Sequence, residues 1–191
     1  AKSEQQSSTI IQQVLHWLEA GHSEGLLSEA GLPEIADPGE ALIAAVHAAG
    51  FPVRPQIGPS SIMLALMASG FNGQHFEFKG YLPSANEERE AALRAIERLN
   101  EQDGRSLIWI ETPYRNDAMM ASMARVLKHD TCVCVATALG SAKEAIQTKS
   151  IAQWRQSAWL PGREPTVFIL GFLAQSARRS QDLKSHRRKH S

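Results

Sequence analysis

Residues 28–39 read SEAGLPEIADPG and residues 57–61 read IGPSS, and these two stretches decide the fold class that the sequence indicates. Each one links a short strand-like run, at residues 25–28 or 51–57, to a segment with helical periodicity. Repeated alternation of strand, turn and helix is typical of a parallel sheet. Because open α/β sheets bind ligands at the carboxyl ends of their strands, both turns are predicted to line a ligand site.

Helical patterns flank the two turns. Apolar residues recur every three to four positions over residues 10–18 and 41–49, and Ser60 or Ser61 can cap a third helix that runs to residue 68. Asp37, Pro38 and Glu40 predict the start of the second helix, with Asp37 as the N-cap and Glu40 completing a capping box. The free amides at helix starts favour an anionic ligand group, although the same residues also serve as ordinary caps.

The second half of the chain predicts further strands and helices. Strands are expected at residues 75–81, 107–110, 131–138 and 166–173, and helices at 84–100, from Thr112 to residue 127, and at 151–154. Ser84 and Glu87 predict a second capping box. Met119, Met120, Met123 and Leu127 predict a buried helical stripe, whereas residues 139–150 show no element.

A glycine-containing junction at residues 69–74 predicts a domain boundary. We therefore expect an N-terminal domain at residues 1–72, a C-terminal domain at 73–175 and a basic tail at 176–191. From residue 178 onward the chain carries six of its 20 Lys and Arg but one of its 20 Asp and Glu. Such a tail is predicted to be disordered, or alternatively to neutralise phosphates.

Composition excludes several classes of protein. No apolar run approaches the length of a membrane span and no charged-then-apolar leader opens the chain, so we expect a soluble, cytoplasmic protein that contacts no membrane. Cys132 and Cys134 lie two apart in a strand-like run and are interpreted as small buried hydrophobic residues. The histidines and cysteines lack metal-ligand spacing, so no metal is predicted.

A set of short motifs identifies a family that the chain resembles. They are, in chain order, EQQ at residues 4–6, LLSEAG at 26–31, ADPG at 36–39, GPS at 58–60, ASG at 68–70, GYLP at 80–83 and ETPYR at 111–115. Together they resemble the successive motifs of the ribosomal RNA ribose methyltransferases in the tetrapyrrole methylase superfamily. The resemblance spans residues 1–115, and beyond them the family pattern is followed loosely, at residues 162–165.

This resemblance implies a two-domain α/β fold, with a parallel-sheet N-terminal domain that is truncated here and a C-terminal domain with a mixed sheet. In the family a strand and a glycine- and proline-rich loop precede the position of Ala1. The implied cofactor is S-adenosyl-L-methionine, the implied partner is RNA or a ribosomal subunit, and the implied assembly is a homodimer. By similarity, the cofactor-binding residues would be Ser28, Glu29, Ala30, Gly31, Pro33, Asp37, Gly58, Ser60 and Ser61.

Two charged residues in the ETPYR motif are candidates for catalysis. Glu111 would help to remove a proton from an acceptor hydroxyl, and Arg115 would hold a phosphate or carboxylate. An ion pair at the end of a strand is an equal alternative for both. Two other functions also stay open: C-methylation of a tetrapyrrole of the precorrin type, and non-catalytic binding of RNA or the ribosome on the same fold.

Overall fold

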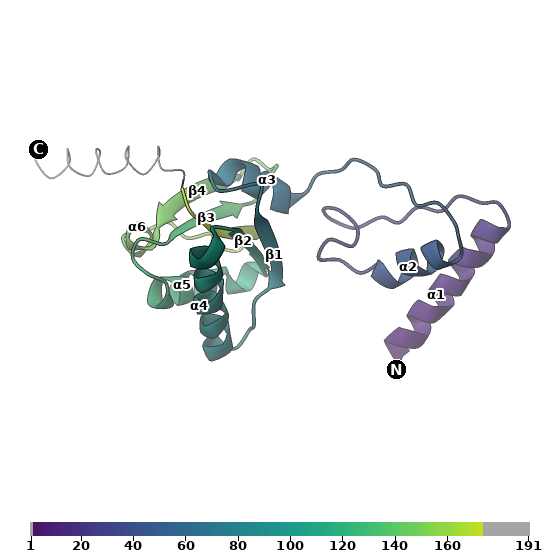
Figure 1. Ribbon diagram of the computed structural model, residues 1–191, viewed down its shortest axis with the longest axis horizontal. Helices are drawn as coiled ribbons and strands as arrows, with labels where there is room; N and C mark the ends of the chain where they lie inside the picture. The colour runs from purple at the N-terminus through teal and green to yellow at the C-terminus, as the bar shows by residue number, and fades with distance from the viewer. Residues whose placement is uncertain (1, 174–191) are drawn as a thin grey trace, which may run out of the picture. The chain divides into compact units, whose positions relative to one another are not determined.

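The computed structural model describes residues 2–173, which divide into two compact units at residues 60 and 61 (Figure 1). The predicted disorder of the basic tail at residues 176–191 lies outside the described residues. Within residues 2–173, no helix combines the length and the apolar content that a membrane crossing requires. Each unit is described separately below.

The first unit contains two helices, α1 (Lys2–Glu19) and α2 (Glu40–Ala48), which pack against each other. Both helices confirm the predicted periodicity. The prediction of strands at residues 25–28 and 51–57 was wrong, because between residues 2 and 75 the structure has no strand. A strand exists only where its amides and carbonyls pair with a neighbouring strand, and Pro52 and Pro55 remove two donors from the second segment.

The predicted cap of α2 was also wrong. Gly39, with a φ of 153°, is the N-cap residue, and no side chain caps the helix. Glu34 and Ala36 lie in the left-handed region, with φ values of 68° and 61°, so the chain turns sharply before the helix begins. Asp37 therefore lies outside the helix, in an exposed part of this turn.

The second unit is built on a five-stranded mixed sheet. Its order is β1-β2-β5-β3-β4, in which β1 and β2 are parallel and every other neighbouring pair is antiparallel. The strands are β1 (Phe76–Tyr81), β2 (Ser106–Glu111), β3 (Cys132–Thr137), β4 (Ala145–Ser150) and β5 (Thr166–Gly171). The predicted mixed sheet is confirmed, and its outer strands β1 and β4 carry Lys79 and Lys149.

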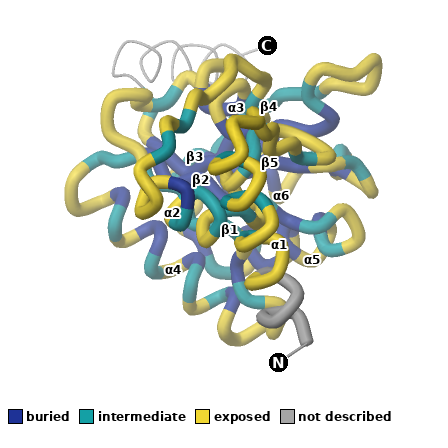
Figure 2. Tube along the Cα trace, turned by 90° about the vertical axis from the view of Figure 1, so that its right-hand side faces the viewer, coloured by how far each residue is buried: buried dark blue, intermediate teal, exposed yellow. Residues whose placement is uncertain are grey.

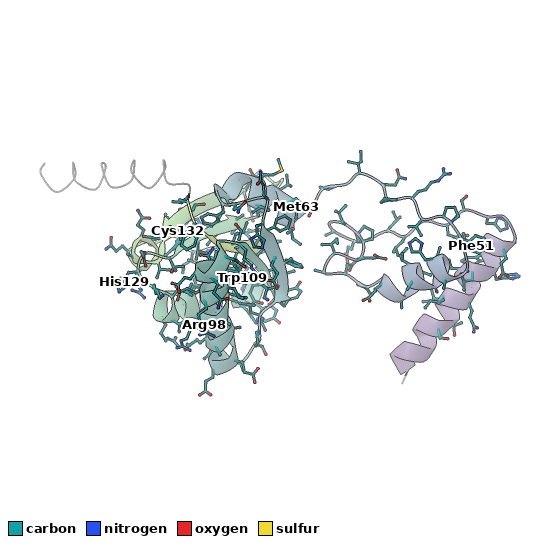
Figure 3. The ribbon with its side chains drawn as sticks, viewed as in Figure 1. Phe51, Met63, Arg98, Trp109, His129 and Cys132 are labelled. Atoms are coloured by element: carbon teal, nitrogen blue, oxygen red, sulfur yellow. The ribbon has the colours of Figure 1, made fainter. Side chains whose placement is uncertain are left out.

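Helices cover both faces of this sheet. On one face lie α4 (Asn86–Asp103), α5 (Asn116–Val126) and α6 (Ile151–Arg155), and on the other lies α3 (Ser61–Ser69). Because side chains alternate along a strand, Leu107 and Trp109 of β2 face the three helices while Ile108 faces α3. Figure 2 shows the burial of each described residue along the chain. Trp109, which is labelled in Figure 3, is fully buried and stacks on the ring of Phe168 in β5.

The methionine stripe of α5 lies in this core as predicted, with Met119, Met120 and Met123 all buried. Cys134 is also buried in the sheet, while Cys132 is half-buried. Since α3 packs on β3, β4 and β5, the compact second unit begins at Ser61. The domain boundary at residue 72 stays a prediction about the complete protein.

Three local features of the second unit differ from the sequence-based expectation. The helix α4 begins after Ala85, and no side chain caps it, so the capping box of Ser84 and Glu87 does not form. Residues 139–150 contain β4, which was expected to be irregular. A capping box that was not predicted opens α6, where Ser150 and Gln153 exchange hydrogen bonds.

A tight contact between Gly171 and Phe71 allows a test of the packing at the end of β5. A Cβ atom added at Gly171 would lie 2.5 Å from Phe71 Cγ, so the ring would have to move. We expect Gly171→Ala to lower the free energy of unfolding by about 2 kcal/mol, as overpacking does, measured by urea denaturation. Gly73→Ala is the control, because nothing lies within 4 Å of a Cβ there; equal losses in both variants would contradict the packing argument.

Candidate functional site

The predicted cofactor loop of the first unit is a surface turn. Glu29, Ala30, Gly31 and Asp37 are exposed, and Ser28 and Pro33 are half-buried. The hydroxyl of Ser28 donates to the carbonyl oxygen of Gly31 at 2.9 Å, which closes the start of the turn. Together with the left-handed residues Glu34 and Ala36, this bond gives the loop a specific non-extended shape.

The second predicted loop approaches the first within the same unit. A Cβ atom at Gly58 would lie 3.0 Å from Leu32 Cδ2, so the absence of a side chain at position 58 allows this close approach. Gly58 is exposed and Ser60 is half-buried. Ser61 is the first residue of α3 and belongs to the second unit. The structure thus brings Gly58 close to the side chain of Leu32 in the 31–33 turn.

Glu111 and Arg115 form an ion pair at the carboxyl end of β2. The carboxylate of Glu111 is buried and accepts hydrogen bonds from Thr112 N at 2.7 Å and from the Arg115 guanidinium at 2.7 Å to each oxygen. Arg115 Nη2 also donates to the carbonyl oxygen of Leu82, which follows β1. The pair therefore fastens the ends of two parallel strands to each other.

The burial of Glu111 determines the electrostatics of this pair. The side chain of Glu111 is 0% exposed and that of Arg115 is 20% exposed, so little water screens the contact. Hydrogen bonding to Glu111 raises the pKa of Arg115, so the guanidinium stays charged. The side-chain hydrogen bonds of Arg115 to residues 2–173 all come from Nε and Nη2, which leaves Nη1 as a donor that can meet an anion.

The helix predicted to restart at Thr112 begins as a short 3₁₀ turn, η1 (Pro113–Arg115), and continues into α5. Thr112 makes no capping hydrogen bond, because its hydroxyl donates to Glu111 Oε1 at 3.2 Å. Tyr114 in η1 is 73% exposed and Tyr81 at the end of β1 is 55% exposed. Two aromatic side chains are therefore accessible at the strand ends that the ion pair joins.

Sequence reasoning missed a cluster beside this ion pair. Asn116 is fully buried, and its amide binds the turn at residues 162–166. Ala138, after β3, has a φ of 49° and donates its N–H to Pro165 O. The signal in the sequence was weak, because an asparagine at a helix start resembles an ordinary cap.

Within residues 2–173, no group of three His, Cys, Asp or Glu side chains could hold a metal ion.

Comparison with known proteins gives sequence relatives of one kind. No family model matches the chain. It is 33% identical over 151 residues to a ribosomal RNA small subunit methyltransferase I of Vibrio cholerae, covering 79% of the chain and 50% of that protein. It is 39% identical over 115 residues to the Micromonospora olivasterospora protein of that name, covering 60% of the chain and 36% of that protein. The chain thus spans half or less of the length of these relatives.

Solved structures share the fold at lower sequence identity. The methyltransferase CobJ superposes with a TM-score of 0.55 and 20% identity, over 84% of this chain and 70% of CobJ. A uroporphyrin-III C-methyltransferase from Thermus thermophilus, complexed with S-adenosylhomocysteine, superposes with a TM-score of 0.50 and 16% identity, over 86% of this chain and 72% of that one. The fold is that of the class of methyltransferases to which these structures belong.

The sequence relatives narrow this class to a family. The chain belongs to the tetrapyrrole methylase superfamily, and the relatives that share its sequence are on the ribosomal RNA methyltransferase branch. The family identified from the motifs is therefore confirmed. The roles of the individual site residues stay predictions.

The buried ion pair gives a prediction for stability. Glu111→Ala leaves Arg115 without its partner, and we expect the free energy of unfolding to fall by about 3 kcal/mol, as when one member of a buried pair is removed. In the control Glu90→Ala, the exposed guanidinium of Arg125 loses its partner, and the expected loss is about 1 kcal/mol or less. Urea denaturation of both variants measures the difference; similar losses would show that burial adds nothing to the Glu111 pair.

Proposed function

We propose that this chain forms part of a methyltransferase that uses S-adenosyl-L-methionine to methylate a ribose hydroxyl of ribosomal RNA. The observation that carries the proposal is the 33% identity over 151 residues to a protein named for this RNA. The bound S-adenosylhomocysteine of a protein with the same fold supports the cofactor. When bound, S-adenosylmethionine would supply a methyl group activated by a sulfonium.

Residues of the two candidate loops suit this cofactor. Gly31 and Gly58 leave the backbone accessible, and exposed Asp37 presents a carboxylate that can accept hydrogen bonds from hydroxyl or amino groups. We propose that Ser28, Glu29, Ala30, Gly31 and Pro33 hold the cofactor from one loop, and that Gly58, Ser60 and Ser61 hold it from the other. The bond from Ser28 to Gly31 would keep the first loop in a binding shape before the cofactor arrives.

Glu111 and Arg115 are proposed to serve the acceptor. The donor at Arg115 Nη1 supports binding of an RNA phosphate, since a guanidinium pairs well with phosphate oxygens. Glu111 keeps this guanidinium in place. Its carboxylate already accepts four hydrogen bonds from Thr112 and Arg115, which favours orientation of Arg115 over removal of the acceptor proton.

Two other functions are the alternatives to this proposal. The likeness to CobJ and to the uroporphyrin-III enzyme favours a tetrapyrrole acceptor, although at 16–20% identity it concerns the fold alone. A non-catalytic protein that binds RNA or the ribosome would need the same acceptor surface without the cofactor. We prefer ribosomal RNA because the relatives at 33% and 39% identity are named for it. We further propose a cytoplasmic homodimer, as the superfamily resemblance implies.

Transfer of a labelled methyl group tests the proposed function in the full-length natural protein. We expect label from S-adenosylmethionine to enter the RNA of small ribosomal subunits and not a tetrapyrrole. We also expect S-adenosylhomocysteine, used as a probe of the cofactor site, to bind with a heat that calorimetric titration can measure. Label in the tetrapyrrole alone would establish the other methylase function, and binding of subunits without any binding of S-adenosylhomocysteine would establish the non-catalytic one.

The approach of Gly58 to Leu32 predicts which residue change weakens cofactor binding. In Gly58→Ala the new Cβ would lie 3.0 Å from Leu32 Cδ2, so the Leu32 side chain in the 31–33 turn would have to shift by a few tenths of an ångström. We expect the dissociation constant for S-adenosylhomocysteine to rise about tenfold, equivalent to about 1.4 kcal/mol. Gly25→Ala is the matched control in the same unit, because a Cβ there meets nothing within 4 Å. Unchanged affinity in Gly58→Ala would remove these loops from the cofactor site.

A further inference from the structure

Asn116 joins two loops at one edge of the sheet. Its Nδ2 donates to the carbonyl oxygens of Gly162 and Glu164 at 2.9 and 2.8 Å and lies 3.0 Å from the hydroxyl of Thr166. That hydroxyl in turn donates to Glu164 O at 2.8 Å. A single amide nitrogen therefore contacts three residues of the turn that leads into β5.

The chemistry of this cluster requires a hydrogen-bond donor at position 116. Its main acceptors are backbone carbonyls, which cannot donate, so only a donor group satisfies them. Asn116 is 0% exposed, and its Oδ1 is buried with no hydrogen-bond partner among the described residues. A buried polar atom without a partner costs free energy, and the three contacts of Nδ2 offset that cost at this position.

The cluster lies next to the ion pair of the candidate site. Asn116 follows Arg115 directly, and in the sheet Glu111 is the register partner of Thr166. The same turn accepts the N–H of Ala138 through Pro165 O, so it also fixes the end of β3. A shift of the turn would therefore move the backbone that carries Arg115.

We propose that Asn116 is a positioning residue for the acceptor: through the 162–166 turn, it holds Arg115 where an RNA phosphate meets its guanidinium. This inference rests on the proposed function. It assigns to Asn116 no contact with the acceptor or the cofactor. Loss of the amide should therefore weaken acceptor binding and leave cofactor binding intact.

Asn116→Asp tests the proposal, because it keeps the shape of the side chain but removes the two N–H donors of the amide. In the full-length protein we expect the KM for small ribosomal subunits to rise at least tenfold, with the affinity for S-adenosylhomocysteine unchanged within twofold. The matched control is Asn100→Asp, since Asn100 is another buried asparagine whose Nδ2 donates to a backbone carbonyl, Arg105 O at 2.7 Å, at the start of β2. A wild-type KM in Asn116→Asp, or an equal rise in Asn100→Asp, would overturn the proposal.

Hydrogen exchange separates this proposal from the proposed function, because it needs neither cofactor nor RNA. The amide of Ala138, held by Pro165 O, should exchange at least tenfold faster in Asn116→Asp and at the wild-type rate in Asn100→Asp. Wild-type exchange in both variants would show that Asn116 does not hold the turn. A wild-type protein that methylates no RNA, with fast exchange in Asn116→Asp, would refute the proposed function and with it the acceptor role, while leaving the turn anchor intact.

A second pair of variants keeps the test decisive if Asn116→Asp does not fold. Thr166→Val removes the hydroxyl that receives Asn116 Nδ2 at nearly constant volume, whereas Thr166→Ser retains it. We expect Thr166→Val to raise the KM for small subunits about fivefold and Thr166→Ser to restore it to the wild-type value. Equal KM values in the two variants would contradict a role for this hydrogen-bonded turn.

Discussion

The pairing of β5 with strands on both sides is the constraint on which the second unit depends. This last strand lies between β2 and β3 and is antiparallel to each, so residues 55–63 positions apart must meet across β2 and β5, and residues 29–39 positions apart across β3 and β5. Its alternating side chains supply Phe168 and Leu170 to one core and Val167 and Ile169 to the other. The register that satisfies both cores also places Thr166 opposite Glu111, and this brings the 162–166 turn to the ion pair.

Sequence patterns predicted the elements whose own residues encode them. The short apolar runs of β2, β3 and β5 and the methionine stripe of α5 were recognised because residues of these types are usually buried. The strand β4 was missed, since all its residues are only half-buried and AIQTKS carries no strong alternation. The prediction of strands in the first unit failed for a different reason: a strand pattern specifies one partner of a ladder, and among residues 2–173 no segment pairs with either stretch.

In the candidate site, too, residues that interact with sequence neighbours were predicted, and a residue that interacts with distant parts of the chain was not. Glu111 and Arg115 were found because they occupy one motif, and their i,i+4 spacing lets them pair without help from other elements. The two candidate cofactor loops could be selected by motif order, but the positive φ of Glu34 and Ala36 could not be predicted, because nothing in those residue types demands it. Asn116 was invisible because its partners lie about fifty residues away and are mostly backbone atoms.

The placement of Lys79 and Lys149 in the two outer strands has a consequence for self-association. An outer strand presents unpaired backbone groups to which another molecule's strand can add, and a charged side chain there opposes such growth into aggregates. Lys79 pairs with Glu77 on β1, and Lys149 lies over the ring of Trp154 beside β4. Two copies that associate specifically would then do so through helical or loop surfaces, and no strand of a second copy would extend the sheet beyond β1 or β4.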